Sequence, residues 1–330
     1  MVKDPLVSII VLNLNGKRHL QRCFTSLKKQ VYSKVEVVMV DNGSVDDSIA
    51  FVKKNFPHVQ LVMNSTNLGF ARACNQGSRA AKGKYLFFLN NDATIGKGTL
   101  KKLVLFMEKN KKVALVGPVV YKKDKISMES AGLVPTLSGF FYHPPLLAKK
   151  PLETFGITGA AMLIREDVFR KIGGFDSDFF IYSEDIDLCT RIKMTGGKVC
   201  VLPETKVFHL HGQTSRKLDK SFVVYHATKN RILLLLKNFS FPLLVIILPI
   251  HFLFLFSGIL LFLLFGKARE AWAMIRGIWW NIKKLLPTLR KRKKIQSLRT
   301  VSDWWLIKRY FKILPIEAFI RAGYVYIKFW

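Results

Sequence analysis

Apolar runs and amphipathic segments alternate along residues 1–120 of the chain. The runs are almost continuously apolar, as strands are when both faces of their sheet are covered. Between the runs, apolar residues recur at helical spacing, as Leu20, Phe24 and Leu27 do. We therefore predict an α/β fold with a mostly parallel central sheet. The strand segments, with their closing turns, are 6–16, 35–44, 59–64, 84–92 and 113–120, and the helices are 18–30, 45–56, 67–83 and 99–110.

The pattern is less regular over residues 121–155, which contain several prolines. We expect loops and short strands there, and no residue of this stretch receives a role. The elements expected after it are a strand and a helix over 156–176, a helix over 183–197 that ends at a glycine, and a strand over 198–212.

The composition changes at residue 238. Residues 238–266 contain no Lys, Arg, Asp or Glu, and as one helix they would exceed the ~30 Å hydrocarbon core of a bilayer. Residues 267–330 hold 16 basic and 3 acidic residues and all six tryptophans. Basic residues mixed with Trp are typical of a helix that lies in a membrane interface. We predict an α/β domain over 1–237, a membrane-inserting segment over 238–266 and an interfacial tail over 267–330.

The net charge of +31, from 53 Lys and Arg against 22 Asp and Glu, implies an anionic partner: nucleic acid, a membrane surface or a phosphorylated substrate. Much of the excess lies beside the apolar segment and no nucleic-acid-binding module is visible, so nucleic acid is the least favoured. The four cysteines form no CxxC pair and the N-terminus lacks a secretory signal, which favours reduced thiols on the cytosolic side.

Polar clusters follow three of the predicted strands: Asn13–Gly16, Asp41–Ser48 and Asn90–Asp92. Each alone is explained by turns and helix caps, which use the same residue types. In open α/β sheets, however, ligands bind beyond the carboxyl ends of the strands. Three clusters at one edge therefore predict a shared site.

Neither GxGxxG nor GxxxxGK followed by Ser or Thr occurs, so a bound nucleotide would need another anchor for its phosphates. A divalent cation held by Asp92 would serve, because hard ions prefer carboxylate oxygens and bridge phosphates. Asn90 could add a weak or water-mediated contact. A histidine could complete the set of ligands, which suits Mn²⁺ at least as well as Mg²⁺.

Glu184, Asp185 and Asp187 begin a predicted helix. They could simply complement the helix dipole, with Ser183 as the N-cap, or one of them could act as a general base. His209 and His211 alternate along a strand and point the same way, either as ordinary surface or core residues or as metal ligands.

These motifs resemble the inverting nucleotide-sugar glycosyltransferases of family 2, which have the GT-A fold, and most closely their rhamnosyltransferase-like branch in bacterial polysaccharide synthesis. The resemblance covers about residues 5–240, and the basic tail is also similar. The matching blocks are VSIIVLNLNG, VDNGSVDDS, NLGFARACNQG, FFLNNDA, the segment from Gly156 to Gly212, and KNRILLLLKN.

The resemblance implies a role for each matched position. Asp185 would be the catalytic base, with Glu184 supporting it or contacting the acceptor. Asp92 would be the last acid of the metal motif, and His209 would complete the metal shell. Asn90 replaces the usual first acid of that motif. The positions implied for nucleotide binding are Asn13, Asp41, Asn67, Gly69, Phe70, Asn75 and Asn91.

We therefore predict a Mn²⁺- or Mg²⁺-dependent transferase that moves a sugar, with rhamnose as one candidate, from a dTDP-, UDP- or GDP-sugar to a hydroxyl of a polyprenyl-linked glycan. A full span would place the basic tail across the membrane, against the positive-inside tendency. A monotopic or hairpin insertion at the cytoplasmic face, bent near Pro249, is favoured instead. The alternatives are a non-catalytic scaffold, suggested by Asn90, and a nucleic-acid-binding protein.

Overall fold

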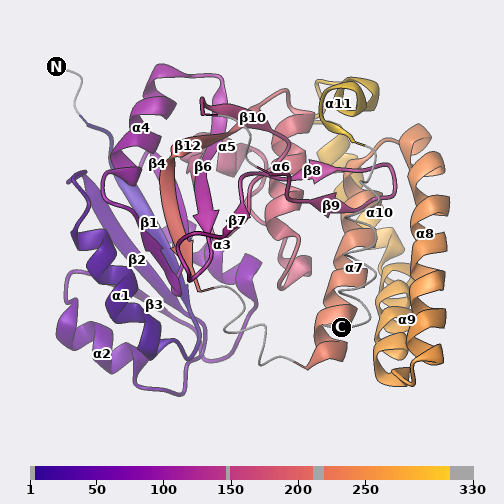
Figure 1. Ribbon diagram of the computed structural model, residues 1–330, viewed down its shortest axis with the longest axis horizontal. Helices are drawn as coiled ribbons and strands as arrows, with labels where there is room; N and C mark the ends of the chain where they lie inside the picture. The colour runs from indigo at the N-terminus through magenta and orange to yellow at the C-terminus, as the bar shows by residue number, and fades with distance from the viewer. Residues whose placement is uncertain (1–3, 146–148, 211–218, 313–330) are drawn as a thin grey trace. The chain divides into compact units, whose positions relative to one another are not determined.

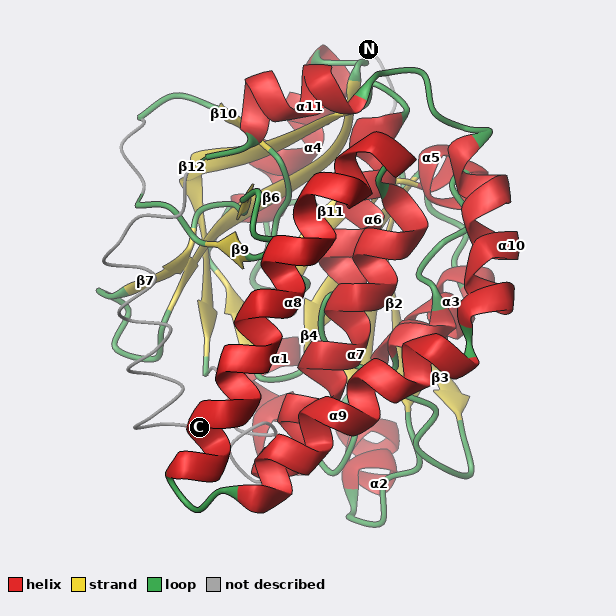
Figure 2. Cartoon of the chain, turned by 90° about the vertical axis from the view of Figure 1, so that its right-hand side faces the viewer, coloured by secondary structure: helices red, strands yellow, loops and turns green. Residues whose placement is uncertain are grey.

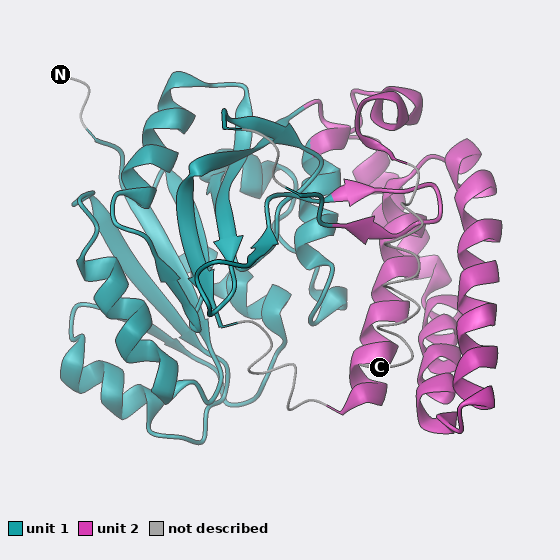
Figure 3. Cartoon of the chain, in the orientation of Figure 1, with its two compact units in different colours: residues 1–133, 143–192, 197–213 teal, residues 134–142, 193–196, 214–330 magenta. Residues whose placement is uncertain are grey.

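The computed structural model describes residues 4–145, 149–210 and 219–312 (Figure 1). The chain forms two compact units, coloured separately in Figure 3. Unit 1 comprises residues 1–133, 143–192 and 197–213, and unit 2 comprises residues 134–142, 193–196 and 214–330.

Unit 1 is built on one large sheet. Its strands are β1 (Val7–Asn13), β2 (Val35–Asp41), β3 (Gln60–Met63), β4 (Tyr85–Asn90), β5 (Ala93–Ile95), β6 (Val113–Tyr121), β7 (Met128–Ser130), β10 (Leu152–Thr154), β11 (Ala161–Arg165) and β12 (Lys198–His209). Its helices are α1 (Lys17–Lys28), α2 (Ser48–Asn55), α3 (Phe70–Ala80), α4 (Thr99–Lys109), α5 (Glu166–Lys171), the 3₁₀ turn η1 (Ser177–Phe179) and α6 (Glu184–Met194). The main strand order is β10-β12-β6-β11-β4-β1-β2-β3, with β5 on β12 and β7 on β6.

The predicted α/β fold is confirmed, including every predicted strand and helix of residues 1–120. Strands β1 to β4 are parallel, and β6 is parallel to β12. The periodicity gave no sign that β11 runs antiparallel between β4 and β6. Residues 121–155 supply short strands and loops, as expected.

Helices on both faces explain why the strands are almost continuously apolar. In β4, Phe87 packs into the core formed with α1, α2 and α4, whereas Phe88 packs into the core formed with α3, α5 and α6. Alternate residues of β1 divide in the same way, with Ile9 on one side and Ile10 on the other. The sheet therefore has no solvent-facing side in its centre, and its carboxyl edge is where polar residues emerge.

Unit 2 is helical. It contains α7 (Lys220–Asn238), α8 (Phe241–Leu264), α9 (Ala268–Lys283), α10 (Leu285–Gln296), α11 (Asp303–Tyr310) and a small hairpin of β8 (Val134–Pro135) and β9 (Phe141–Tyr142). Helices α7, α8 and α9 pack around a shared apolar cluster that includes Ile232, Leu255 and Met274 (Figure 2).

Helix α8 contains most of the apolar segment predicted to insert into a membrane. It runs unbroken through Pro249, so a hairpin that turns at this proline is wrong. Among the described residues, α8 is the one helix long and apolar enough to cross a membrane. Such a helix can also form the core of a soluble protein, but only 28% of its most apolar window is buried.

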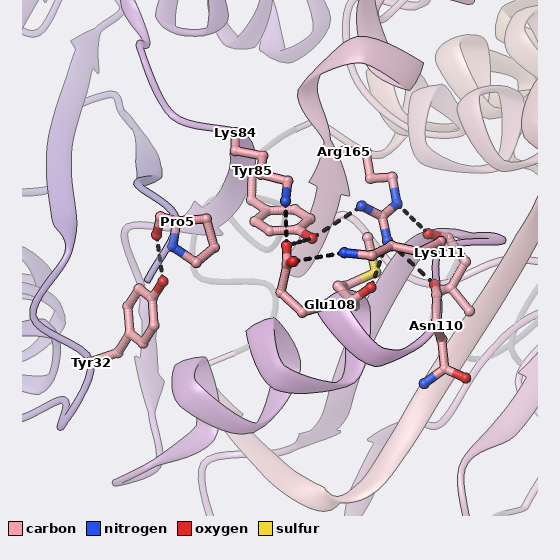
Figure 4. Close-up of polar contacts among 10 residues, drawn as sticks. Pro5, Tyr32, Lys84, Tyr85, Glu108, Asn110, Lys111 and Arg165 are labelled. Carbon is pink, nitrogen blue, oxygen red and sulfur yellow. Dashed lines mark hydrogen bonds and ion pairs between the residues drawn. The ribbon is translucent and has the colours of Figure 1, made fainter. Parts of the chain in front are cut away.

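Arg165, at the end of β11, holds together neighbouring parts of unit 1 (Figure 4). Its buried guanidinium donates hydrogen bonds to the carbonyls of Val113 and Met107, at 2.8 Å and 2.6 Å, and to the hydroxyl of Tyr85. A third carbonyl, that of Asn110, accepts a longer bond. These acceptors lie at the end of α4 and the start of β6 and β4, so one side chain satisfies several buried groups at once.

Replacing Arg165 with Met is expected to destabilise unit 1 by about 3 kcal/mol, because buried carbonyls lose their donors. The apparent melting temperature of the full-length chain should fall by roughly 6–12 °C. The control is Arg170→Met, which removes an exposed ion pair with Glu166 and should change the melting temperature little. Equal melting temperatures for the two variants would contradict this account.

Candidate active site

Asn13, Asp41 and Asn91 meet at the carboxyl edge of the sheet. Strands β1 and β2 pair in parallel with Asn13 opposite Asp41. The Asn13 amide donates to Asp41 over 2.9 Å, and the Asn91 amide donates to Asn13 over 2.7 Å. Ser44 donates its main-chain N–H and its hydroxyl to Asp41, at 2.9 Å and 2.6 Å. The structure thus brings three predicted nucleotide-binding residues together and fixes the orientation of the buried Asp41 carboxylate.

Gly16 is required for this arrangement. A Cβ at this position would lie 2.1 Å from the amide nitrogen of Asn91 and 2.4 Å from the side-chain oxygen of Asn13. No side chain can occupy that space, so the glycine of the NLNG motif lets the two asparagines approach each other.

The other four predicted nucleotide-binding residues support the loop before α6. The Asn67 side chain accepts from the N–H of Gly69 and from the amide of Asn42. Gly69 has φ = 82°, and a Cβ there would lie 2.7 Å from the carbonyl oxygen of Phe180. The Phe70 N–H donates to that same carbonyl.

Asn75 is held in a reciprocal pair with the main chain of Phe175. Its amide donates to the Phe175 carbonyl over 2.7 Å and its oxygen accepts from the Phe175 N–H over 2.9 Å. The aromatic ring of Phe175 also packs edge-on against that of Phe70. These four residues mainly contact protein main chain and aromatic rings, and the side chain of Asn42, next to Asp41, links them to the group around Asp41 through its bond to Asn67.

Asp92 and His209 lie side by side because β5 pairs with the end of β12, with Ala93 opposite His209. Nε2 of His209 lies 3.1 Å from Oδ1 of Asp92 and 3.3 Å from the Asn90 amide nitrogen. Burial alone would lower the pKa of His209, but hydrogen bonds and charge from Asp92 and Glu129 raise its pKa to about 9. The predicted pair of metal ligands is therefore in contact.

Glu129 was missed by the sequence analysis. Both of its carboxylate oxygens lie 3.1 Å from Nδ1 of His209. It lies in the irregular stretch, where no periodicity or motif marks it. His211, the second histidine considered, lies outside the described residues. Among the described residues, no group of three or more His, Cys, Asp or Glu has the arrangement of a metal site.

Asp185 begins α6 and is fixed by main-chain donors. The N–H groups of Gly159 and Ile186 each donate to one oxygen of its carboxylate, both over 2.7 Å. The next residue, Ala160, accepts from the N–H of Asn90 over 3.1 Å. Two successive residues therefore hold the predicted base and the start of the predicted metal motif. Both contacts lie where β4 ends and β11 begins, so the two predicted parts of the site lie at the same edge of the sheet.

Glu184 and Asp185 differ in what stabilises their charge. Burial raises the pKa of Asp185, although the two main-chain N–H donors lower it in part. Burial raises the pKa of Glu184, and the charges of Asp185 and Asp187 add to that effect. One Glu184 oxygen has no hydrogen-bond partner among the described residues. Glu184 therefore keeps its proton when Asp185 has lost its own.

Asp187, the third acid of this cluster, forms a buried ion pair with Arg191 at 2.7 Å and so has a structural role. Ser183 has φ = 66°, which is not the extended conformation of the N-cap it was expected to provide. Phe180 and Tyr182 also have positive φ, at 62° and 71°. Such a run of non-glycine residues costs about 1–2 kcal/mol each and precedes the predicted catalytic acids.

Comparisons with known proteins show what this chain is similar to. Over 249 residues the chain is 24% identical to an N-acetylglucosaminyl-diphospho-decaprenol L-rhamnosyltransferase of Mycobacterium tuberculosis, covering 67% of this chain and 81% of the relative. Over 264 residues it is 26% identical to a dTDP-rhamnosyl transferase of Shigella flexneri, covering 72% and 82%.

A solved mannosyltransferase of Pyrobaculum calidifontis, in complex with GDP-Man and Mn²⁺, has the same fold, with a TM-score of 0.55. It shares 17% identity and covers 90% of this chain and 81% of the solved chain. This likeness confirms the predicted GT-A fold.

Two family descriptions match the sequence. Residues 147–213 match the one described as the N-terminal domain of galactosyltransferase. Residues 8–173, about half of the chain, match glycosyl transferase family 2. They contain the Asp41 group, the Asn90–Asp92 turn and the Gly159–Ala160 pair. The chain belongs to glycosyl transferase family 2.

Proposed function

We propose that this chain is an inverting, metal-dependent glycosyltransferase that moves a sugar from a nucleoside diphosphate to a hydroxyl of a lipid-linked glycan. The observation that carries the proposal is the pair of main-chain contacts at Gly159 and Ala160. One fixes Asp185, and the other fixes the strand end that leads to Asp92. A single displacement needs a base and a leaving-group site within reach of the same sugar, and both proposed groups lie at one edge of the sheet.

Asp92 and His209 suit a divalent cation. Oδ1 of Asp92 and Nε2 of His209 lie 3.1 Å apart, so both atoms could bind one ion. One carboxylate and one imidazole leave further positions for phosphate oxygens. A carboxylate on the other nitrogen of the ring is a common support for a metal-binding histidine, and Glu129 is in that place.

The bound cation would offset the charge that develops on the departing diphosphate. Asp185, oriented by Gly159 and Ile186, would take the proton from the acceptor hydroxyl as its oxygen attacks the anomeric carbon. One displacement from the opposite face inverts the configuration without a covalent intermediate. Protonated Glu184 would donate a hydrogen bond to a substrate oxygen, since one of its oxygens has no partner within the described part of the chain.

Asp41 would accept a hydrogen bond from the nucleobase, with Asn13 and Asn91 beside it. Asn67, Gly69, Phe70 and Asn75 would shape the nucleotide pocket through the loop before α6, which they support. The names of the relatives favour a dTDP-linked rhamnose as donor, while the GDP-Man of the solved mannosyltransferase keeps other nucleotide sugars in the test set.

The partner proposed for unit 2 is the cytoplasmic face of the membrane. Helix α8 exposes large apolar side chains, such as Leu253 at 66% and Phe256 at 67%. On α9, Trp272, Ile275 and Trp279 follow one another at helical spacing and are also exposed. A bilayer covers such a surface in a way that water does not. The relative from M. tuberculosis is named for a decaprenol diphosphate substrate, which supports a lipid-linked acceptor.

In this proposal the three segments predicted from the sequence divide the work. Residues 1–237 carry out the reaction, residues 238–266 insert their apolar side chains, and residues 267–330 contact the headgroups. The insertion is monotopic, with the basic tail on the same side as the sheet.

Asp185→Asn is expected to lower nucleoside diphosphate release by about 10²–10⁴-fold, because the general base is lost. Release is measured with dTDP-rhamnose, UDP-sugars and GDP-sugars in the presence of Mn²⁺. The variant should still show the thermal shift that the donor produces, whereas Asp92→Ala should lose both the release and the shift. The control is Asp167→Asn, at an exposed carboxylate on α5, which should behave as wild type. If the wild-type chain releases no nucleoside diphosphate from any donor, the non-catalytic scaffold is the better account.

The pH dependence of kcat/KM should show a loss of activity on the acid side (the acid limb), at a pH above the ordinary aspartate pKa of about 3.9. Burial raises the pKa of Asp185, so activity is lost as the pH falls through that raised pKa. The assay uses saturating Mn²⁺ to keep the metal site filled. Glu184→Gln should keep the limb, since Glu184 already holds its proton there. A limb at or below pH 4 would count against Asp185 as the base.

Leu253→Glu together with Phe256→Glu should weaken the binding of the full-length chain to phosphatidylglycerol vesicles by about 10²-fold or more, from the burial energy of two large side chains. Flotation with vesicles after dilution from detergent measures the effect. Ile126→Glu is the matched control, because Ile126 is 84% exposed but lies in unit 1. Unchanged flotation of the double variant would exclude α8 as the membrane contact.

A further inference from the structure

Strand β7 contains a bulge whose extra residue is Glu129. Val120 of β6 pairs with Ser130 and Tyr121 pairs with Met128, so Glu129 is the extra residue between two successive pairs of the ladder. A bulge turns one side chain away from its normal direction and is often found beside active sites. Here the side chain that it turns reaches His209 in β12, the strand that pairs with the opposite edge of β6.

We propose that Glu129 is a positioning residue that selects the tautomer and the ring orientation of His209. Its two oxygens are equally distant, at 3.1 Å, from Nδ1 of His209. The Nδ1–H group therefore donates to Glu129, and Nε2 is the nitrogen directed at Asp92. Because the two ring nitrogens point in different directions, Glu129 cannot share an ion at Nε2 and acts only through the ring.

The burial of the three side chains makes this orientation strict. His209, Asp92 and Glu129 are only 9%, 11% and 12% exposed. Little water reaches Nδ1, so no solvent molecule readily replaces the carboxylate. With an apolar residue at position 129, the imidazole ring could rotate, and Nε2 would no longer be held toward Asp92.

The residue that follows Glu129 anchors β7 from its other side. The Ser130 hydroxyl contacts Nδ1 of His143 at 2.8 Å, and the same nitrogen lies 3.2 Å from the carbonyl of Gly132. Ser130 itself is buried. The bulge is thus held by a buried neighbour, so the position of Glu129 does not depend on His209 alone.

This inference rests on the proposed metal site and adds a prediction about selectivity. Imidazole nitrogen suits Mn²⁺ better than Mg²⁺, which prefers oxygen ligands. If Glu129 keeps His209 available, it should contribute to Mn²⁺ affinity and to the preference for Mn²⁺ over Mg²⁺. A charge effect alone would change the affinities for both ions together.

The experiment titrates the full-length chain, without donor, with Mn²⁺ alone and with Mg²⁺ alone, by calorimetry or by the electron paramagnetic resonance of free Mn²⁺. Glu129→Ala should weaken Mn²⁺ binding by about 10–100-fold and should reduce the preference for Mn²⁺. Glu129→Gln, whose amide oxygen can still accept from Nδ1–H, should stay within a few-fold of wild type. Glu204→Ala, at an exposed position on β12, is the control for loss of a negative charge.

The inference is overturned if Glu129→Ala keeps the Mn²⁺ affinity and selectivity of the wild type. It is also overturned if Glu129→Gln and Glu129→Ala lose Mn²⁺ affinity equally, because this would indicate an effect of charge and not of ring orientation. Asp92→Ala and His209→Ala separate this failure from failure of the metal site. If neither of them weakens Mn²⁺ binding, the proposed cation site is itself wrong. If both weaken it while Glu129→Ala does not, only the role of Glu129 is wrong.

Discussion

Gly159 donates its N–H to Asp185, and its neighbour Ala160 accepts from the N–H of Asn90. The second of these bonds extends the ladder between β4 and β11, in which Leu89 lies opposite Ala161. That register is set by buried apolar residues on both faces, and a slip by one residue would turn each of them to the opposite face. The separation of Asp185, the proposed base, from the proposed metal motif is therefore set by the packing of the core, and it does not depend on contacts between the two polar groups themselves.

The same edge of the sheet must also hold charges that burial disfavours. His209 lies between two carboxylates, and Asp185 lies beside Glu184. Each group is stabilised in a different way: Asp185 by main-chain N–H donors and His209 by hydrogen bonds on both nitrogens. The loop before α6 adds strain, since Phe180 and its neighbours adopt positive φ. Gly69 and the N–H of Phe70 stabilise that loop by packing on and donating to Phe180, which explains why the NLGF motif matters although it lies far from α6 in the sequence.

The sequence predicted the parts of this site that lie at the ends of apolar strands. Continuous apolar runs identified the parallel strands, and their ends located Asn13, Asp41 and Asp92, because parallel strands deliver their carboxyl ends to one edge. The acids at 184–187 and the two histidines were candidates from the sequence, the resemblance to family 2 chose Asp185 and His209 among them, and the structure places both at this edge as well. Glu129 could not be found in this way, since a bulge depends on the pairing of β7 with β6 and leaves no periodic signal. The loop at Phe180 was equally hidden, because aromatic residues carry no propensity for positive φ and only tertiary contacts impose it.

Unit 2 follows a different rule from unit 1. In unit 1 the large apolar residues of the central strands are buried, whereas α8 and α9 place Leu253, Phe256 and Trp272 at the surface. Burial of such side chains is the main force that stabilises a fold in water, so their exposure costs free energy unless another apolar phase covers them. The exposed basic residues nearby, such as Lys283, Lys284 and Arg290, would repel one another in the absence of anions. An anionic bilayer relieves both costs together, since its interior accepts the apolar groups and its headgroups accept the cations. If the acceptor is lipid-linked, as proposed, the excess of positive charge in this chain follows from where that substrate is dissolved.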